Sequence, residues 1–424
     1  MRRSQTRISL LHNMGSLILV AMEHQHMAGQ MDTPDSEDTE DQPLLLQLGP
    51  LLFLAAIFFL GFLSRIILGP LMPTIKQDLA LSHGMAGTLF LFISAGYCVS
   101  LLGSGFISSR LTHRKMIILS ATAVAAALFG TSLSVGLWGV RLGLFTLGLA
   151  AGLYLPSGMA TLTSIVDSRH WGKAIAIHEL APNLSFMAAP LVSEALLPWF
   201  SWRGILAFLG LTSLLAAFAF KRLGRGGDFP GEAPTFSVLK SLFCDSSFLI
   251  MLLLFSLAIG ASLGVYAMLP LYLTTEQAMD RGLANTLIGL SRFSGLIMAF
   301  VAGWTSDCLG PRLTIWIVIL LTGVTTFLLG ILSGPWLVIM VFLQPTLAVC
   351  FFPAGFAAIS ALGPESTRNV AVSFTVPVAF LIGGGAIPAG IGIMADAGAF
   401  SLGIVLVGMA TVVGFLLSLF LKPT

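Results

Sequence analysis

The chain has 424 residues, of which 56% are apolar and only 9% are charged, and its mean hydropathy is +0.95. A soluble chain of this length needs a larger charged surface, so the composition excludes a set of soluble domains and indicates a polytopic membrane protein. The 21 Lys and Arg residues nearly balance the 19 Asp and Glu residues, and a net charge of +2 gives no reason to expect nucleic-acid binding. The four cysteines stand singly, without the spacing of a metal or redox site, and nothing indicates a cofactor.

Residues 1–47 differ in composition from the rest of the chain. A short apolar stretch, MGSLILVAM, is followed by the acidic run DTPDSEDTEDQP. The stretch is too short to span a bilayer, and acidic runs of this kind do not form a packed core. We predict a disordered cytoplasmic extension.

From residue 48 onward the chain consists of apolar runs about as long as a membrane-spanning helix, which needs roughly 20 residues. Runs this long without alternation of polar and apolar residues are typical of helices and not of barrel strands. We predict an all-α membrane protein with twelve transmembrane helices, near residues 50–72, 84–107, 115–133, 136–164, 172–197, 203–221, 247–273, 283–306, 313–332, 335–361, 370–395 and 399–420.

The cations in the connections gather on one side of this arrangement. If the N-terminus is cytoplasmic, most Lys and Arg residues fall inside, and only Lys76, Arg203 and Arg281 fall outside. The positive-inside rule then places both termini in the cytoplasm, and we expect the protein in the cell inner membrane.

The longest internal break, KRLGRGGDFPGEAPTFSVLK at 221–240, is polar, basic and rich in Gly and Pro, as a linker is. We predict a six-helix bundle at 48–221, a cytoplasmic linker at 222–246 and a second six-helix bundle at 247–424. Four pairs of residues recur at a separation of 197 or 198 positions: Pro73 and Pro270, Gly105 and Gly303, Pro156 and Pro353, and Pro190 and Pro388. Two pseudo-symmetric halves are typical of secondary transporters, whose site lies between the halves at mid-membrane.

The loop after the second span of each half carries the motif that links the chain to a known family. The second copy keeps the frame G-x-x-x-D-R-x-G-R-R through Gly303, Asp307, Gly310 and Arg312. The first copy keeps Gly105, Arg110, Arg114 and Lys115, whereas Ser109 replaces the aspartate and Thr112 the second glycine. From residue 48 the chain resembles the major facilitator superfamily. The resemblance implies alternating access, with a carboxylate that pairs across cytoplasmic helix ends that separate when the transporter opens inward.

Three arginines lie inside predicted spans. Helix geometry places Arg65, Arg141 and Arg292 roughly 9–14 Å from the outer helix ends. A guanidinium at such a depth costs at least about 2.5–3.5 kcal/mol, so each one faces a wet cavity or a partner. An arginine of this kind can pair with an internal acid or backbone carbonyls, or it can bind an anionic substrate. Acids at matching depth are scarce, which favours a substrate carboxylate or phosphate.

The resemblance extends to the surroundings of these arginines. The spacing of Arg65 before the sequence MP is similar to that of the helix 1 substrate arginine in the organophosphate:phosphate antiporters and the anion:cation symporters. The fourth span is similar to the symporters through Arg141, Gly148, Gly152 and Pro156. Two positions depart: Ala151 replaces an acid linked to proton coupling in the symporters, and Ser262, the repeat partner of Arg65, replaces a second arginine of the antiporters. Only the preference for an anion is therefore carried over.

The fifth span contains the sequence HELAPN, with His178, Glu179 and Asn183. A buried carboxyl group that faces a cavity can relay protons, so these residues are candidates for proton coupling. A salt bridge from Glu179 to an arginine on the cytoplasmic side, or a purely structural His–Glu pair, remains an alternative. Residues expected to line the cavity with the arginines are Tyr97, Tyr154, Tyr266, Gln344 and Asn285.

We predict a monomeric secondary transporter that moves a small organic anion across the lipid bilayer, and not an enzyme, because no catalytic constellation appears. One alternative keeps the fold and makes it a proton-linked efflux pump for drugs or metabolites, in which the arginines are structural and Glu179 is essential. A second alternative is a non-transporting membrane sensor, which would favour a larger signalling loop than residues 222–246.

Overall fold

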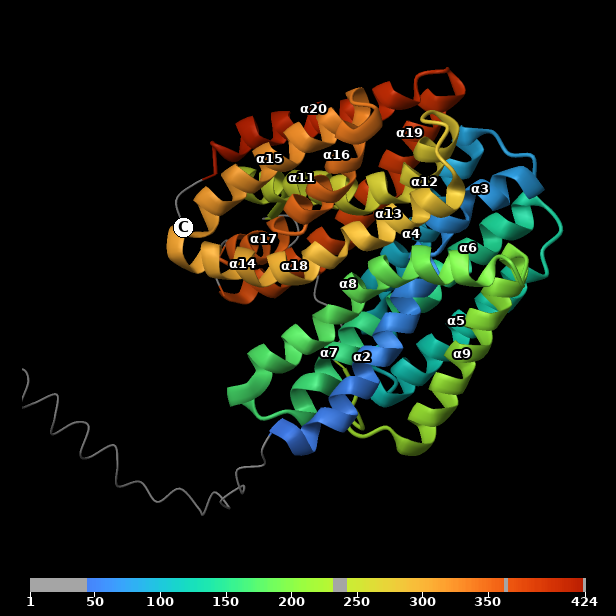
Figure 1. The fold of residues 1–424 in the computed structure, drawn as a ribbon. Coiled ribbons are helices and arrows are strands. Elements are labelled where there is room, and N and C mark those ends of the chain that lie inside the picture. Colours follow the sequence, from blue (N-terminus) through green and yellow to red (C-terminus); the bar gives the residue numbers. More distant parts are fainter. Residues whose placement is uncertain (1–43, 232–241, 362–364, 422–424) are drawn as a thin grey trace, which may run out of the picture. The chain divides into compact units, whose positions relative to one another are not determined.

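The structure is a computed structural model that describes residues 44–231, 242–361 and 365–421, with only the backbone described at 44–46, 299–300 and 365–369. Disorder is predicted for residues 1–47; residues 1–43 lie outside the described residues, whereas 44–47 are helical and begin α2. Contacts divide the chain into two units, Met1–Leu46 and Gln47–Thr424, and the helices discussed below belong to the second unit (Figure 1).

The first half of this unit is helical from end to end of its described part. Its elements are α2 (Leu44–Ile66), α3 (Leu68–Asp78), α4 (His83–Ser108), α5 (His113–Ser132), α6 (Leu137–Gly152), α7 (Tyr154–Ile165), the 3₁₀ turn η1 (Ser168–His170), α8 (Trp171–Leu196) and α9 (Trp202–Leu223).

The second half contains π-helical turns within two of its spans. Its elements are α11 (Ser246–Ile259), the π-turn η2 (Gly260–Gly264), α12 (Val265–Thr275), α13 (Arg281–Ser291), α14 (Phe293–Leu309), α15 (Pro311–Ile331), α16 (Gly334–Ala348), α17 (Phe351–Ser360), α18 (Glu365–Leu381), the π-turn η3 (Ile382–Ala386), α19 (Ile387–Asp396) and α20 (Phe400–Ser418).

Eleven of the described helical segments are long and apolar enough to cross a membrane, and a twelfth is present if the bent segment at 281–309 counts as one span. The predicted all-α class with twelve spans in two six-helix bundles is thereby confirmed. The first span differs from the prediction because its helix continues through α3 to Asp78. Hydropathy marks the thickness of the hydrocarbon layer, and the helix extends beyond that layer into the polar interface.

The breaks inside the helices repeat at the separation found in the sequence. The first span breaks at Ile67, between α2 and α3, and the π-turn in the seventh span ends 197 positions later, at Gly264. The fourth span breaks at Leu153, and the tenth breaks 197 positions later, at Cys350. The two halves therefore share the positions of their irregular turns as well as their prolines and glycines.

Several helices begin at a side chain that accepts a hydrogen bond from the first turn, as N-caps do. Ser82 accepts from the backbone of Met85 at the start of α4. Ser201 and Asp280 act in the same way at the starts of α9 and α13. These polar residues end the connections at the membrane surface and fix where each span enters the bilayer.

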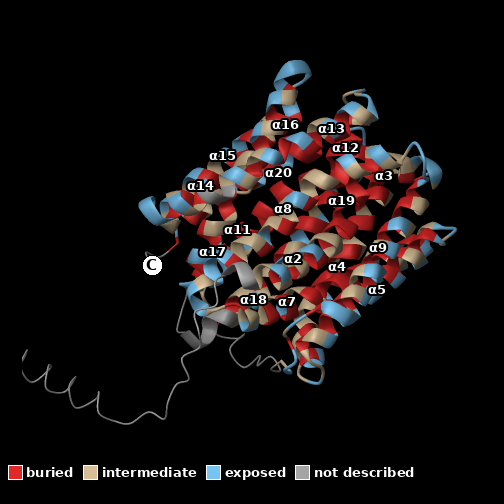
Figure 2. Ribbon diagram, turned by 60° about the horizontal axis from the view of Figure 1, so that its bottom comes forward, coloured by how far each residue is buried: buried red, intermediate tan, exposed pale blue. Residues whose placement is uncertain are grey.

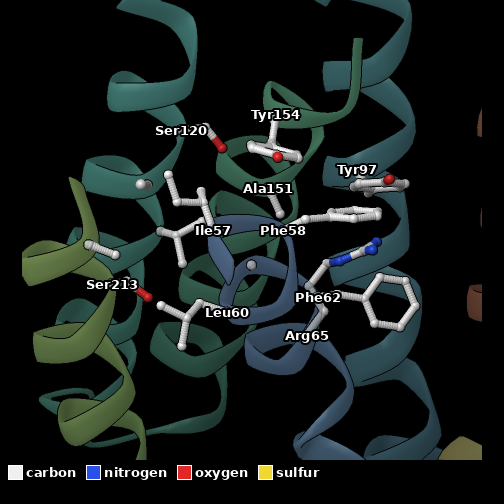
Figure 3. Close-up of a pocket in the computed structure, with 14 residues that line it drawn as sticks. Ile57, Phe58, Leu60, Phe62, Arg65, Tyr97, Ser120, Ala151, Tyr154 and Ser213 are labelled. Atoms are coloured by element: carbon white, nitrogen blue, oxygen red, sulfur yellow. The ribbon is translucent and has the colours of Figure 1, made fainter. Parts of the chain in front are cut away.

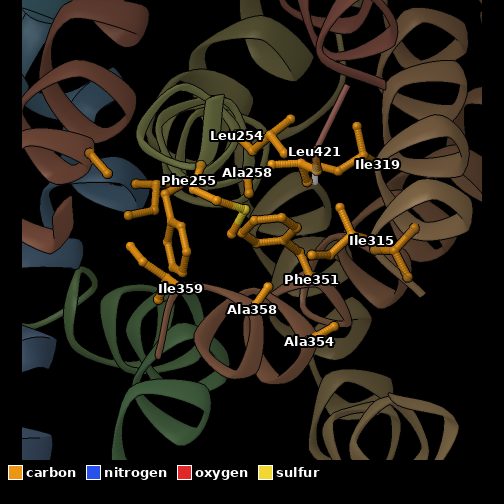
Figure 4. Close-up of a cluster of buried hydrophobic side chains, with 14 of the residues drawn as sticks. Leu254, Phe255, Ala258, Ile315, Ile319, Phe351, Ala354, Ala358, Ile359 and Leu421 are labelled. Atoms are coloured by element: carbon orange, nitrogen blue, oxygen red, sulfur yellow. The ribbon is translucent and has the colours of Figure 1, made fainter. Parts of the chain in front are cut away.

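Large apolar side chains lie on both the outside and the inside of the second unit. Exposed examples are Leu142, Phe218 and Trp304, which are 65%, 58% and 69% exposed, and exposed positions run along the outer faces of the helices in Figure 2. This pattern is expected when the solvent is lipid. Inside the second half, Phe255 and Phe351 meet edge to face at 5.1 Å within a buried apolar cluster (Figure 4).

Glycines allow the closest approach between spans. A Cβ atom at Gly96 of α4 would overlap the carbonyl oxygen of Phe145 and lie 2.9 Å from the backbone nitrogen of Leu149, both in α6. A Cβ atom at Gly148 would likewise overlap the carbonyl oxygen of Ile93. The α4–α6 contact thus depends on the absence of two side chains, as in other small-residue interfaces in membranes.

We expect Gly96→Ala to lower the melting temperature of the purified protein, because its methyl group pushes α6 away from α4. Overpacking of this kind typically costs about 1–3 kcal/mol. The matched control is Gly103→Ala on the same helix, where a Cβ atom meets nothing within 4 Å. Thermal unfolding in detergent measures both, and equal melting temperatures for the two variants would contradict the assignment.

Candidate functional site

A cavity lies between the two halves. Its lining comes from α2 and α4 of the first half and from η2, α12, α18 and η3 of the second. Its volume is about 30 Å³, so a guest larger than a few water molecules requires the walls to move apart. Most of the lining is apolar, with Phe62, Phe90, Tyr266 and Phe380 as its aromatic members and Arg65 and Ser94 as polar members. We call this space the central cavity.

Arg65 projects from α2 into the central cavity and is only 9% exposed. Its guanidinium carbon lies 3.8 Å from the centre of the Tyr97 ring, 4.8 Å from that of Phe62 and 5.6 Å from that of Phe380. Its Nε atom is buried without a hydrogen-bond partner, and Arg65 forms no ion pair within the described residues. Ring faces therefore stabilise the cation while one of its N–H donors stays unused.

Arg292 lies at the break between α13 and α14 and is also buried. Its guanidinium carbon is 4.7 Å from the centre of the Phe186 ring and 4.8 Å from that of Tyr266. Its Nη2 atom donates to the carbonyl oxygen of Ser262 at 3.2 Å. Ser262 occupies the position in the second half that Arg65 occupies in the first half. The guanidinium of Arg292, which comes from another span, therefore contacts the backbone at this equivalent position.

Aromatic rings connect the two cations. The Phe62 and Phe186 rings meet edge to face at 5.4 Å, and the Phe186 and Tyr266 rings do so at 4.9 Å. In the first half the arginine is on the first span and its tyrosine, Tyr97, on the second; in the second half the tyrosine is on the first span and the arginine on the second. Both halves therefore contain a guanidinium packed on a tyrosine, but the spans that carry the arginine and the tyrosine are swapped between the halves.

A second cavity of about 20 Å³ lies inside the first half, and Phe62 and Arg65 line both cavities. Figure 3 shows the Arg65 guanidinium against the Tyr97 ring, with Tyr154 further along the same cavity. Ser213 also lines it, and its hydroxyl oxygen is buried without a hydrogen-bond partner. Arg65 therefore sits between the interface of the two halves and a mostly apolar recess in the first half.

The contacts of Tyr154 fix the tautomer of His178. The Tyr154 hydroxyl carries one hydrogen, which it donates to the carbonyl oxygen of Leu54 at 2.7 Å. Its oxygen therefore accepts from Nε2 of His178, at 3.1 Å. The His178 ring is fully buried and stacked on Phe58 at 4.5 Å, so a neutral ring presents an unprotonated Nδ1 atom.

Glu179 is the carboxylate that faces this nitrogen. Its Oε1 atom lies 3.5 Å from Nδ1 of His178, which has no hydrogen-bond partner, and its side chain is 51% exposed. Asn183 lies one turn further along α8 and donates to the backbone carbonyl of Glu179 at 3.3 Å. The geometry brings His178 and Glu179 together and leaves Asn183 bonded to its own helix.

Arg141, Arg292 and Gln344 line neither cavity. The Nη2 atom of Arg141 is 3.3 Å from Oγ1 of Thr88, and its guanidinium lies 4.8 Å from the ring of Trp138, which is 72% exposed. Gln344 donates to the carbonyl oxygen of Ala261 at 2.9 Å and to Thr326 at 3.1 Å. Substrate binding by Arg141 and Gln344 therefore stays a prediction from the sequence.

The first copy of the loop motif contacts the segment that follows α9. Residues 224–231 form a strap across the α4–α5 connection, in which Gly227 accepts from the backbone of Arg114 and Gly231 donates to Ser108, both at 2.8 Å. Arg114 also forms an ion pair with Asp228 at 3.6 Å. Gly105 precedes this connection in α4, and Arg110 is exposed within it.

The second copy holds a turn and the end of α20. Gly310 has a φ of 83° between α14 and α15, a conformation that favours glycine. Arg312 donates to the carbonyl oxygen of Leu419 at 3.0 Å. Gly303 has open space at its Cβ position, and Asp307 is exposed and forms no ion pair among the described side chains, which omit those at 362–369. A pairing of Asp307 across the helix ends stays a prediction.

Two carboxylates join the halves at the predicted outer end. Asp396, the last residue of α19, accepts from Ser82 Oγ at 2.7 Å and from the backbone nitrogens of His83 at 2.6 Å and Gly84 at 2.9 Å. It therefore places a negative charge at the N-terminus of α4, where the helix dipole stabilises it. A Cβ atom at Gly84 would lie 2.6 Å from the same carboxylate, so glycine is needed for this approach.

Glu194 forms the second of these contacts. It accepts from Nε of Arg281 at 3.1 Å and from Nδ2 of Asn285 at 2.6 Å, both in α13. Asn285 also donates to the carbonyl oxygen of Pro70 at 3.3 Å, so it lies here and not in the central cavity, contrary to the expectation. Spans five and eleven are repeat equivalents, as are spans two and eight, so the repeat relates the two contacts. We call them the carboxylate locks.

The sequence analysis missed Phe62, Phe90, Phe186 and Phe380. Phenylalanines inside apolar spans are indistinguishable from packing residues by composition. A signal existed only for Phe62, which precedes Arg65 by three positions and therefore shares its helix face. The other three come from different spans and required the tertiary arrangement.

Comparisons with known proteins agree with this arrangement. The family model described as "Major Facilitator Superfamily" matches residues 54–335. The "Probable 4-methylmuconolactone transporter" of Cupriavidus pinatubonensis is 26% identical over 328 residues, which are 73% of this chain and 74% of that protein. The "Voltage-gated purine nucleotide uniporter SLC17A9" of Homo sapiens is 26% identical over 147 residues, and the match spans about a third of that protein's length.

Solved structures show the same fold at low sequence identity. A bacterial homolog of the human lysosomal transporter Spinster, in an inward-facing and occupied conformation, matches with a TM-score of 0.73 and 15% identity over 87% of this chain and 94% of that chain. A D-xylose-proton symporter matches with a TM-score of 0.73 and 14% identity over 89% and 98% of the two chains.

We expect removal of both carboxylate locks to separate the halves at the predicted outer end. In Asp396→Ala with Glu194→Ala, the donors of α4 and α13 lose their acceptors, which favours a state in which water reaches them. Spin labels at Val135 and Ser333, both exposed in connections at this end, should report longer distances by pulsed electron paramagnetic resonance after replacement of the native cysteines.

Asp78→Ala is the matched control for the locks. Asp78 forms its ion pair with Arg203 inside the first half, so its removal breaks an exposed pair without unlinking the halves. An unchanged distance distribution in the double variant, or the same change in the control, would show that the locks do not hold this end closed.

Proposed function

As a member of the major facilitator superfamily the chain is a multi-pass membrane transporter, and we propose that its cargo is a small organic anion held by Arg65 in the central cavity. The expected mechanism is alternating access by rocking of the two halves around this cavity. We further propose a monomer in the cell inner membrane with both termini in the cytoplasm.

The observation that carries the proposal is the buried charge without a counter-charge. Arg65 and Arg292 are 9% and 8% exposed, and neither has a carboxylate partner among the described residues. A buried cation is normally paired, because its desolvation is not otherwise offset. An anion beside Arg65 would supply the missing charge, and Arg292, one ring pair away, would add to the positive potential of the cavity.

The relatives support the same class of cargo. Their printed substrates are 4-methylmuconolactone and purine nucleotides. A muconolactone carries a carboxylate and a nucleotide carries phosphate, so both are organic anions at neutral pH. The two differ in size and shape, and what they share is the negative charge.

We expect Arg65→Ala to reduce counterflow of organic anions in proteoliposomes by about 30-fold or more. Loss of one partner of a buried charge-assisted contact costs about 2–5 kcal/mol. Arg65→Lys keeps the charge but not the planar fork, so its activity should be intermediate. The substrate panel contains mono- and dicarboxylates, sugar acids and phosphate esters.

Two further variants make this measurement specific. Arg222→Gln removes a cation beside Phe218 on α9, away from both cavities, and should leave counterflow unchanged. Arg141→Gln decides whether the third predicted arginine takes part. Transport of uncharged or cationic drugs that survives Arg65→Ala, with no anion transported, would favour the efflux alternative.

We also propose that His178 and Glu179 form a site for one proton. In the deprotonated pair, the lone pair of Nδ1 faces a carboxylate at 3.5 Å, which is repulsive. A proton bound at Nδ1 makes both ring nitrogens donors, one to Tyr154 and one to Glu179, and turns the repulsion into an ion pair. The half-exposed Glu179 gives this proton a route from water to a fully buried ring.

We expect Glu179→Gln to abolish uptake driven by a proton gradient and to preserve counterflow at equal pH, because an amide carries no charge to stabilise the protonated His178 ring and cannot pass it a proton from water. Gradient-driven uptake against counterflow in the same vesicles measures this difference. Glu276→Gln is the control, since Glu276 lies at the predicted outer end and accepts only from Ser401 at 3.3 Å among the described residues. Gradient-driven uptake that persists in Glu179→Gln would make the pair structural.

A further inference from the structure

We propose that the central cavity takes a flat, unsaturated organic acid with a single carboxylate, of the aromatic monocarboxylate class. This inference rests on the proposed transport of an anion and adds the class of anion. The contacts of Arg65, the composition of the cavity walls and the placement of Arg292 each support it independently.

The contacts of Arg65 select a planar acceptor. The guanidinium carbon lies over three rings, the closest being Tyr97 at 3.8 Å from the ring centre, so part of the surroundings of the guanidinium is already occupied. The unpartnered Nε–H group lies in the guanidinium plane. A carboxylate presents two oxygens in one plane and can meet this edge with parallel hydrogen bonds.

The cavity walls select against further polar groups on the cargo. Besides Arg65, the polar side chains of the lining are Ser94 and Tyr266, and the Tyr266 hydroxyl lies 3.4 Å from the carbonyl oxygen of Phe186. The hydroxyls of a sugar acid would therefore be buried with few partners. Each unpaired polar group weakens binding by roughly 10-fold or more.

The placement of Arg292 limits the cargo to one charge. Arg292 does not line the central cavity; its guanidinium lies against the rings of Phe186 and Tyr266, of which Tyr266 lines that cavity. It also donates to the carbonyl oxygen of Ser262. A second carboxylate on the cargo would meet aromatic walls in place of a guanidinium, so a dicarboxylate should bind worse than a monocarboxylate.

The aromatic walls favour a flat body. Phe62, Phe90, Tyr266 and Phe380 line the same cavity from four segments of both halves. Aromatic pairs in offset or edge-to-face geometry gain a factor of about 2–10 over equal apolar area. A conjugated ring attached to the carboxylate can make such contacts on several sides, and a saturated ring of the same size cannot.

Binding of radiolabelled benzoate to the purified full-length protein tests the class. Competitors are cyclohexanecarboxylate, which has a saturated ring, terephthalate, which has a second carboxylate, gluconate, which is a sugar acid, and benzamide, which has no charge. We expect cyclohexanecarboxylate to compete about 2–10-fold more weakly than unlabelled benzoate, terephthalate and gluconate at least 10-fold more weakly, and benzamide not at all.

Variants on one helix connect the preference to the walls. Phe380→Leu should bring benzoate and cyclohexanecarboxylate close to equal affinity, because it removes a ring and keeps an apolar side chain. Phe374→Leu is the matched control on α18, where the Phe374 ring packs on Phe243 at 5.2 Å and does not line the cavity. The control should keep the preference of the parent protein.

The outcomes separate failure of the class from failure of the proposed function. Equal competition by benzoate and cyclohexanecarboxylate, or stronger competition by terephthalate or gluconate, overturns the class and leaves anion transport standing. Absence of benzoate binding together with Arg65-dependent counterflow of another anion also overturns the class alone. Absence of counterflow for every anion of the panel overturns the proposed function as well.

Discussion

The burial of two guanidinium groups that have no carboxylate partner in the described part of the chain is the constraint around which the interior of this protein is arranged. An apolar interior cannot hold a bare cation, so the chain surrounds Arg65 and Arg292 with ring faces, which attract a cation without neutralising it. A carboxylate in the same place would fill the site permanently. Rings leave the positive charge available, as the proposed binding of an anion requires and as a structural ion pair would not.

The internal repeat explains why acids are scarce at the centre and present at one end. The acids that the sequence places near the outer helix ends, Glu194 and Asp396, are used between the halves, each against the start of a helix of the other half. The spans that carry them, five and eleven, are repeat equivalents, although the two acids are 202 positions apart and not 197 or 198. Both contacts are held by hydrogen-bond donors at the edge of the bilayer, where water can replace the carboxylates when the halves separate.

Much of the fold could be predicted because apolar run length and the 197-residue separation are properties of the sequence itself. Arg65 could be recognised in the same way, since a guanidinium in hydrocarbon requires a reason. The aromatic neighbours could not, because a phenylalanine such as Phe186 looks the same in a core, in lipid and beside a cation. The depth of a residue along its helix was also insufficient to identify the cavity-lining arginines. Arg141 was predicted at a depth similar to that of Arg65, but it lies on a helix face that points toward Thr88 and an exposed tryptophan. Which face a residue occupies depends on neighbouring spans that contribute no signal near it in sequence.

The strap at 224–231 shows that the first half extends beyond its last helix. Backbone hydrogen bonds to Ser108, His113 and Arg114 attach these residues to the α4–α5 connection, although α9 ends at Leu223. In the proposed rocking motion the strap would travel with the first half, which therefore extends at least to Gly231. A split gene expressing the halves as separate polypeptides should be cut there, because a cut after the last helix would strip the α4–α5 turn of its main-chain partners.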